Sequence, residues 1–77
     1  MTLDKHKIDG LIQITVRVLP AVEFDNLLIQ AGYNKIGSAP AQGNRLKSWW
    51  SHSIYARVEA IYSSDGAVAI TAYHVDF

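Results

Sequence analysis

The first third of the chain carries two hydrophobic patterns of different period. Residues 12–18 alternate apolar and polar side chains and are rich in β-branched types, which favours a strand. A helical stripe through Ile8, Leu11, Thr15 and Leu19 fits the same segment, so a helix is the competing interpretation. Pro20 is expected to end either element.

The next segment predicts a helix over about residues 20–31. From Phe24 to Ala31, apolar side chains recur at the i, i+3, i+4 and i+7 spacing of a single helical face. Pro20 suits the first turn, Glu23 suits the positive helix start, and Gly32 suits the position after the last turn. This is the main helix of the predicted fold.

The rest of the chain predicts an antiparallel meander. Residues 33–37 form a short strand or its approach, 38–44 a loop, 45–50 and 54–62 two strands joined by a turn or bulge at 51–53, and 67–75 the last strand. We therefore expect a single α+β domain over 1–77, in which the helix packs on a four- to five-stranded, mostly antiparallel sheet. Residues 1–9 are expected to be a flexible tail.

The last hairpin has a predicted register. Ser64, Asp65 and Gly66 fit a three-residue loop with glycine in the left-handed position. This loop sets Val58 opposite Ala72, Ala60 opposite Ile70, and Tyr62 near Val68, which together form an apolar face toward the helix. On the other face, Glu59 then lies beside Thr71 and Arg57 beside Tyr73.

These four polar residues could carry out phosphodiester chemistry. Arg57 can hold a phosphate bidentately, and Thr71 and Tyr73 supply neutral hydroxyls. Either Glu59 or His52, in the turn before them, could take a proton near neutral pH. The alternative is a surface ion pair of Arg57 and Glu59 beside ordinary strand residues.

Charge separation along the chain changes the meaning of its net charge. The 77 residues hold 7 Lys+Arg and 7 Asp+Glu, which sum to zero. Lys35, Arg45, Lys47 and Arg57 lie in a window, 26–58, without any Asp or Glu, so the window carries +4 and the remainder −4. The window also holds Trp49, Trp50 and Tyr55, and cations interleaved with aromatic rings are typical of nucleic-acid surfaces. A solvated face above core aromatics is the alternative interpretation.

Arg45, Lys47, Trp49 and Tyr55 are the candidate RNA-binding residues. Adjacent residues in a strand point to opposite faces, so one of Trp49 and Trp50 is expected in the core, and the pattern does not decide which.

Several kinds of site have no signal in the sequence. There is no cysteine, and His6, His52 and His74 lack metal-ligand spacing, so no metal or other cofactor is expected. His74 is expected at the rim of the core on the helix side. No apolar run is long enough to span a membrane, and no secretory signal is visible.

The C-terminal half resembles a known family. Trp49-Trp50-Ser51-His52, Arg57 to Tyr62 and Ile70-Thr71-Ala72-Tyr73 are similar to the C-terminal ribonuclease domains of bacterial polymorphic toxins, including contact-dependent growth inhibition effectors. Those domains are grouped with barnase, EndoU, colicin and RelE-type ribonucleases. The resemblance covers about residues 24–77. An N-terminal helical pair is common in the family, whereas one helix is expected here.

The resemblance implies a metal-independent RNA-cleaving toxin and, because transfer RNA is often the substrate in this family, a tRNase. It implies a cognate immunity protein, a translation factor of the target cell as a possible helper, and delivery within a larger secreted effector that acts in the target-cell cytoplasm. Thr71 and Tyr73 match the family's active-site strand, Arg57 and Glu59 match its neighbour, and His52 matches more weakly. Two other functions stay open: a non-catalytic RNA-binding module, and an immunity or antitoxin protein that binds another protein.

Overall fold

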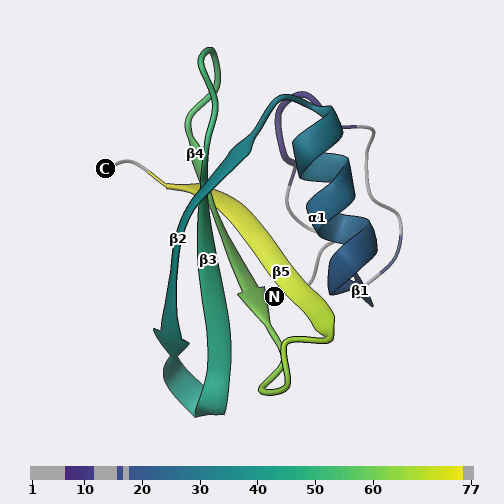
Figure 1. Cartoon of the computed structure of the whole chain (residues 1–77), viewed down its shortest axis with the longest axis vertical. Helices are drawn as coiled ribbons and strands as arrows, with labels where there is room; N and C mark the ends of the chain where they lie inside the picture. The colour runs from purple at the N-terminus through teal and green to yellow at the C-terminus, as the bar shows by residue number, and fades with distance from the viewer. Residues whose placement is uncertain (1–6, 12–15, 17, 76–77) are drawn as a thin grey trace.

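The computed structural model describes residues 7–11, 16 and 18–75. Its elements are β1 (Leu19–Pro20), α1 (Ala21–Gln30), β2 (Asn34–Ala41), a 3-10 turn (Gln42–Asn44), β3 (Arg45–Ser51), β4 (Arg57–Tyr62) and β5 (Val68–Val75). The strands form one antiparallel sheet in the order β1-β5-β4-β3-β2, against which α1 packs (Figure 1). The α+β class and the single main helix are therefore confirmed.

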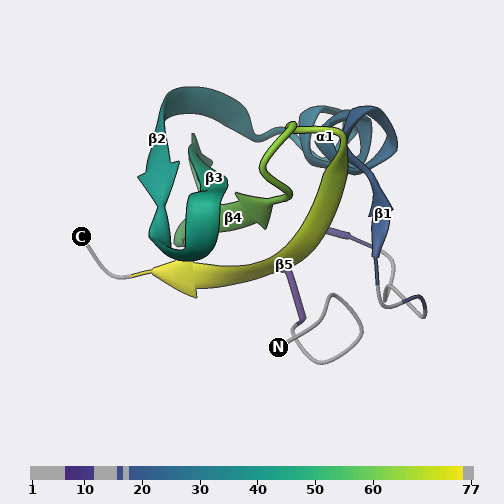
Figure 2. The same ribbon diagram turned by 90° about the horizontal axis from the view of Figure 1, so that it is seen from below.

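Helix α1 begins directly after Pro20 and ends before Gly32, as the sequence predicts. It buries Ala21, Phe24 and Leu28 against the sheet. Gly32 has a φ of +99°, a conformation that favours glycine, and it lets the backbone N–H of Tyr33 donate to the Leu28 carbonyl over 3.0 Å. Figure 2 shows the curved sheet with α1 on one side of it, so the helix faces only one surface of the sheet.

The core lies between that helix and the even-numbered positions of β3 and β4. Trp50, Val58 and Ala60 are buried there with Phe24 and Leu28 of the helix. Trp50 is therefore the core tryptophan, and Trp49 points to the other face.

Strand β2 corrects the loop predicted at 38–44. Residues 38–41 continue the strand, and only Gln42–Asn44 form the turn to β3. The Ser, Ala and Pro composition indicated a loop, but β2 is an edge strand, where Pro40 costs no ladder hydrogen bond when its nitrogen faces outward. A register shift between Lys35 and Gly37 leaves Ile36 as the extra residue of a bulge.

In the β4–β5 hairpin, β4 keeps its predicted faces, but on β5 Ala69 is buried in the core in place of Val68 and Ile70, and the predicted partners are wrong. Ala60 lies opposite Ala72, and Val58 lies opposite His74, so Ala60–Ile70 and Val58–Ala72 are wrong. The register shifts between Ile61 and Tyr62, and Tyr62 pairs with Ala69 rather than lying near Val68. The sequence pattern could not reveal this irregularity, because both Ala69 and Ile70 are apolar.

Other boundaries also differ from the predictions. Strand β4 starts at Arg57 rather than at 54, because residues 52–56 form the connection from β3. The strand or helix predicted at 12–18 falls mainly on residues outside the described ones. Within the predicted tail, Ile8 is buried in the core and the Asp9 carbonyl accepts a 2.6 Å hydrogen bond from the Tyr33 hydroxyl. No helix in the described part of the chain is long and apolar enough to cross a membrane.

Replacing Phe24 by alanine tests the core. Because the Phe24 side chain is fully buried, we expect Phe24→Ala to lower the free energy of unfolding by about 3–5 kcal/mol, enough to unfold much of a domain this small. Val22 on the same helix is 73% exposed, so Val22→Ala should change stability by no more than about 0.5 kcal/mol. Urea denaturation followed by far-UV circular dichroism measures both, and equal effects would contradict this core.

Candidate functional site

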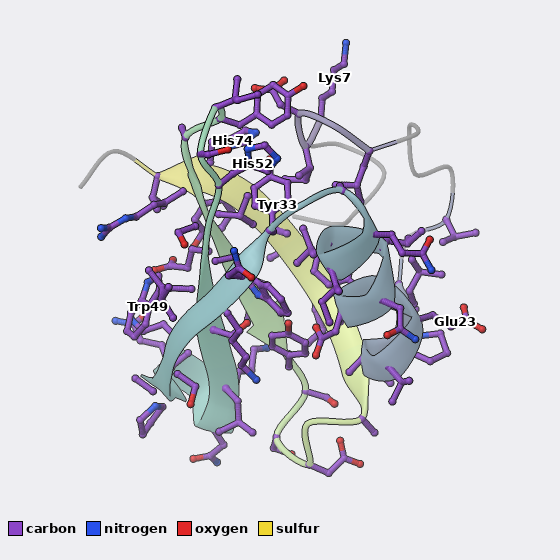
Figure 3. All side chains as sticks on the ribbon, turned by 45° about the horizontal axis from the view of Figure 1, so that its top comes forward. Lys7, Glu23, Tyr33, Trp49, His52 and His74 are labelled. Carbon is purple, nitrogen blue, oxygen red and sulfur yellow. The ribbon has the colours of Figure 1, made fainter. Side chains whose placement is uncertain are left out.

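A row of three side chains crosses the sheet face that points away from α1. Trp49 on β3 lies opposite Glu59 on β4, which lies opposite Tyr73 on β5. The Trp49 indole N–H donates to Glu59 Oε1 over 2.9 Å, and the Tyr73 hydroxyl donates to Glu59 Oε2. Figure 3 shows Trp49 on the side of the sheet opposite α1. Both oxygens of the carboxylate are thus oriented by neighbouring strands.

Trp49 is itself held by the neighbouring strands. On β2 it lies opposite Gly37, where a Cβ atom would come within 3.3 Å of Trp49 Cε3, so the missing side chain leaves room for the indole. The Lys47 ammonium lies 5.2 Å from the centroid of the indole ring, within cation–π range. The indole therefore has a fixed orientation beside the carboxylate.

The next row contains Lys47, Ile61 and Thr71, again on β3, β4 and β5. This row, together with Glu59 and Tyr73 of the first row, lines a hollow of about 360 Å³. Its lining residues are Ala41, Gln42, Arg45, Lys47, Glu59, Ile61, Thr71 and Tyr73. We call it the outer hollow. Its size is within the range of small-ligand sites.

Thr71 is the least expected polar residue in the outer hollow. Its side chain is 4% exposed, and its Oγ1 atom has no hydrogen-bond partner among the described residues. A buried hydroxyl without a partner costs free energy, about 1–3 kcal/mol by analogy with other buried polar groups. A bound polar group could satisfy it, which makes Thr71 a candidate contact for a ligand.

The electrostatics of the outer hollow favour an anion. Arg45 and Lys47 contribute two positive charges against the single carboxylate of Glu59. The hydrogen bond to Glu59, with a further contribution from burial, raises the pKa of Tyr73 to about 12. Tyr73 therefore keeps its proton at neutral pH and acts as a hydrogen-bond donor.

The structure brings together five of the predicted site residues: Arg45, Lys47, Glu59, Thr71 and Tyr73. Arg57 lies on the same face and is exposed, but it is not a lining residue of the outer hollow. The predicted partners on β5 are wrong by two residues. Glu59 faces Tyr73 rather than Thr71, and Arg57 faces Val75 rather than Tyr73.

His52 and Tyr55 lie elsewhere, in the connection between β3 and β4. The His52 Nδ1 atom accepts the backbone N–H of Ile54 over 3.0 Å, so its Nε2 atom carries the proton toward the Ala31 carbonyl, 2.9 Å away. The ring packs on Tyr33 and Tyr55 at centroid distances of 4.7 and 4.6 Å. His52 thus joins the turn to the end of α1, and neither it nor Tyr55 lines the outer hollow.

His74 lies on the helix side, as expected. Its Nε2 atom accepts the backbone N–H of Asp9 over 3.0 Å, and its Nδ1 atom lies 3.0 Å from the Ala56 carbonyl. Figure 3 shows His74 and His52 at the end of the sheet where β3 leads into β4.

Sequence reasoning missed the lining residues Ala41, Gln42 and Ile61. Ala41 and Gln42 fall in the segment predicted to be a loop. Ile61 lies opposite Thr71, where the predicted register placed Glu59. In the described part of the chain, no group of three His, Asp or Glu side chains could hold a metal ion. No protein-family model, curated protein or solved structure matches this chain.

His52→Ala tests a structural role for this histidine. The change removes the acceptor for the Ile54 N–H, the donor to the Ala31 carbonyl and the ring contacts, so we expect a loss of about 1–3 kcal/mol in the free energy of unfolding. Urea denaturation measures this loss. For the ribonuclease expected from the sequence, RNA cleavage by the variant, assayed below its unfolding transition, should stay within about threefold of the parent, since a general base contributes at least about a hundredfold. A larger loss of cleavage than this would return His52 to the catalytic set.

Tyr73 and Glu59 make a second test, by titration. In the folded chain the pKa of Tyr73 is raised to about 12, so its stabilising contribution is present below about pH 10, where an unfolded tyrosine ionises, and is lost as the pH rises through 12. We expect Glu59→Gln to lower this pKa toward 10, observed in the Tyr73 Cζ chemical shift.

Tyr33 serves as the internal control for that titration. Its pKa is raised to about 12 by burial first and by Asp9 second, so Glu59→Gln should leave it in place. An unchanged Tyr73 in the same spectra would refute the hydrogen bond to Glu59.

Proposed function

We propose that this chain is an RNA-cleaving domain that uses the outer hollow for phosphodiester transfer. The observation that carries the proposal is that a single hollow on the face away from α1 is lined by Glu59, Thr71, Tyr73, Arg45 and Lys47. Such a set combines a proton acceptor, neutral donors and two cations, which are the groups that cleavage of RNA by its own 2′-hydroxyl requires.

Glu59 is the proposed general base. It takes the proton of the 2′-hydroxyl as the 2′-oxygen attacks phosphorus, because each carboxylate oxygen keeps a lone pair beyond the one bonded to Trp49 or Tyr73. Tyr73 passes its hydroxyl proton to the leaving 5′-oxygen and regains one from the protonated Glu59. The proton balance closes, and the products are a 2′,3′-cyclic phosphate and a 5′-hydroxyl.

The remaining groups bind the charged phosphate. Lys47 and Arg45 compensate the negative charge that builds up on the phosphorane. The Thr71 hydroxyl, which has no hydrogen-bond partner among the described residues, donates to a phosphate oxygen. Arg57 would contact the RNA backbone outside the hollow, and no step is assigned to His52.

The resemblance of the C-terminal strands to toxin ribonuclease domains supports the same proposal. The resemblance extends the proposal to a tRNA substrate, a cognate immunity protein that blocks the site, a translation factor of the target cell as a helper, and delivery in a larger effector to the cytoplasm of that cell. Residues Ile70 to Tyr73, on which the resemblance depends most, include two residues of the outer hollow.

Non-catalytic RNA binding is the second candidate function. The observation that favours it is that both oxygens of Glu59 already accept hydrogen bonds, as they would in a carboxylate whose role is to hold three strands together. In that case the cations and Trp49 matter for RNA, while the charge of Glu59 does not.

RNA cleavage by purified variants decides between these functions. The chain is incubated with total bacterial RNA, and new fragment ends are analysed chemically. We expect ends carrying 2′,3′-cyclic phosphate, and a rate reduced about 10²–10⁴-fold by Glu59→Gln, since the amide cannot accept the proton. Lys47→Met should also slow cleavage, whereas Lys7→Met, which removes an exposed cation outside the hollow, should not.

Intact RNA that shifts in a gel, with the shift lost in Lys47→Met but kept in Glu59→Gln, would establish the binding module instead. Cleavage that Glu59→Gln leaves at the parental rate would exclude the outer hollow as the catalytic site.

A further inference from the structure

A second hollow, of about 380 Å³, lies on the helix side of the sheet. We call it the inner hollow. Its walls are apolar, with Ala21 from α1, Pro40 from β2 and Leu46 from β3 among them. Polar groups enter it from Asp25, Ser48 and Tyr62, and Ser38, Lys47 and the exposed Lys35 also line it. Of these polar residues, the proposed RNA chemistry uses Lys47 alone.

A directed chain of hydrogen bonds runs along the inner hollow. The Trp50 indole N–H donates to Ser48 Oγ over 2.8 Å, Ser48 pairs with the Tyr62 hydroxyl at 2.9 Å, and Tyr62 donates to Asp25 Oδ1 over 2.6 Å. An indole nitrogen can only donate, and a carboxylate can only accept. The direction is therefore fixed, and both hydroxyl protons are already committed.

The hydroxyl groups of this hydrogen-bonded row are buried. The exposed fractions of Ser48 and Tyr62 are 1% and 6%. Burial, followed by the hydrogen bond to Asp25, raises the pKa of Tyr62, so its hydroxyl stays protonated as the donor to the carboxylate. Ser48, Tyr62 and Asp25 can therefore offer a ligand only acceptor lone pairs and one negative charge. A ligand in the inner hollow must supply the hydrogen-bond donors.

The geometry points to a guanidinium ligand. We propose that the inner hollow binds a small zwitterion with a guanidinium at one end, a short aliphatic stem, and a carboxylate at the other end. The planar guanidinium donates to Asp25 and to the oxygens of the hydroxyl chain, as its fork matches a carboxylate. The stem packs on the apolar walls, and Lys35 balances the carboxylate.

The two tryptophans make the binding test specific. The indole N–H of Trp50 belongs to the inner hollow, and that of Trp49 donates to Glu59 on the other face. We expect 4-guanidinobutyrate to shift the Trp50 indole signal in ¹H–¹⁵N spectra with saturation and to leave the Trp49 signal in place. Length-matched 5-aminopentanoate should bind more weakly, since an ammonium cannot pair bidentately.

Matched variants test the contacts. Asp25→Asn keeps a carbonyl acceptor for Tyr62 but removes the charge, and it should weaken binding of 4-guanidinobutyrate about tenfold or more. Glu23→Gln removes an exposed charge from the same helix and should leave binding unchanged. Lys35→Met should weaken the binding of 4-guanidinobutyrate by about threefold. It should leave unchanged the binding of N-acetyl-arginine amide, which has no carboxylate.

Four outcomes would overturn the proposal: no saturable shift of Trp50, an equal shift of Trp49, equal binding of 5-aminopentanoate, or unchanged binding in Asp25→Asn. If N-acetyl-arginine amide binds more tightly than 4-guanidinobutyrate, the free zwitterion is wrong and an arginine side chain of a protein is the source of the guanidinium.

Discussion

One helix of ten residues packs against a sheet of five strands, and this imbalance shapes the rest of the molecule. Because side chains alternate along a strand, β3 and β4 must divide their residues between a face that the helix covers and one that it does not. Large apolar groups such as Trp50 and Val58 fill the covered face. The other face keeps a carboxylate, two cations and two hydroxyls within reach of one another.

The alternation also explains why the zero net charge conceals a polar site. Arg45, Lys47 and Arg57 are odd-numbered positions on β3 and β4, so all three face away from the helix with Glu59. The fourth cation of the basic window, Lys35, lies opposite Trp50 and belongs to the helix side. The window predicted from the sequence is thus divided by the sheet, and three of its four cations lie on the outer face.

The sequence predicted whatever depends on a repeating period, and it failed where a single residue interrupts one. Helix α1 and the inward set Val58, Ala60 and Tyr62 follow from their spacing. The register of β5 does not, because the irregularity beside Ile70 depends on tertiary packing that alternating apolar residues do not encode. His52 shows a different limit, since its hydrogen-bond partner Ala31 is 21 residues away and its role depends on the folded chain.

Strand β2 also affects how the molecule meets copies of itself. An edge strand exposes backbone groups to which another chain can add a strand, the first step of many aggregates. Here Pro40 supplies no N–H, the bulge at Ile36 interrupts the ladder, and Lys35 adds a charge at the near end. The same residues that made this segment resemble a loop in the sequence make it a poor template for the addition of a strand from another chain. The β2 edge of the sheet therefore disfavours polymerisation.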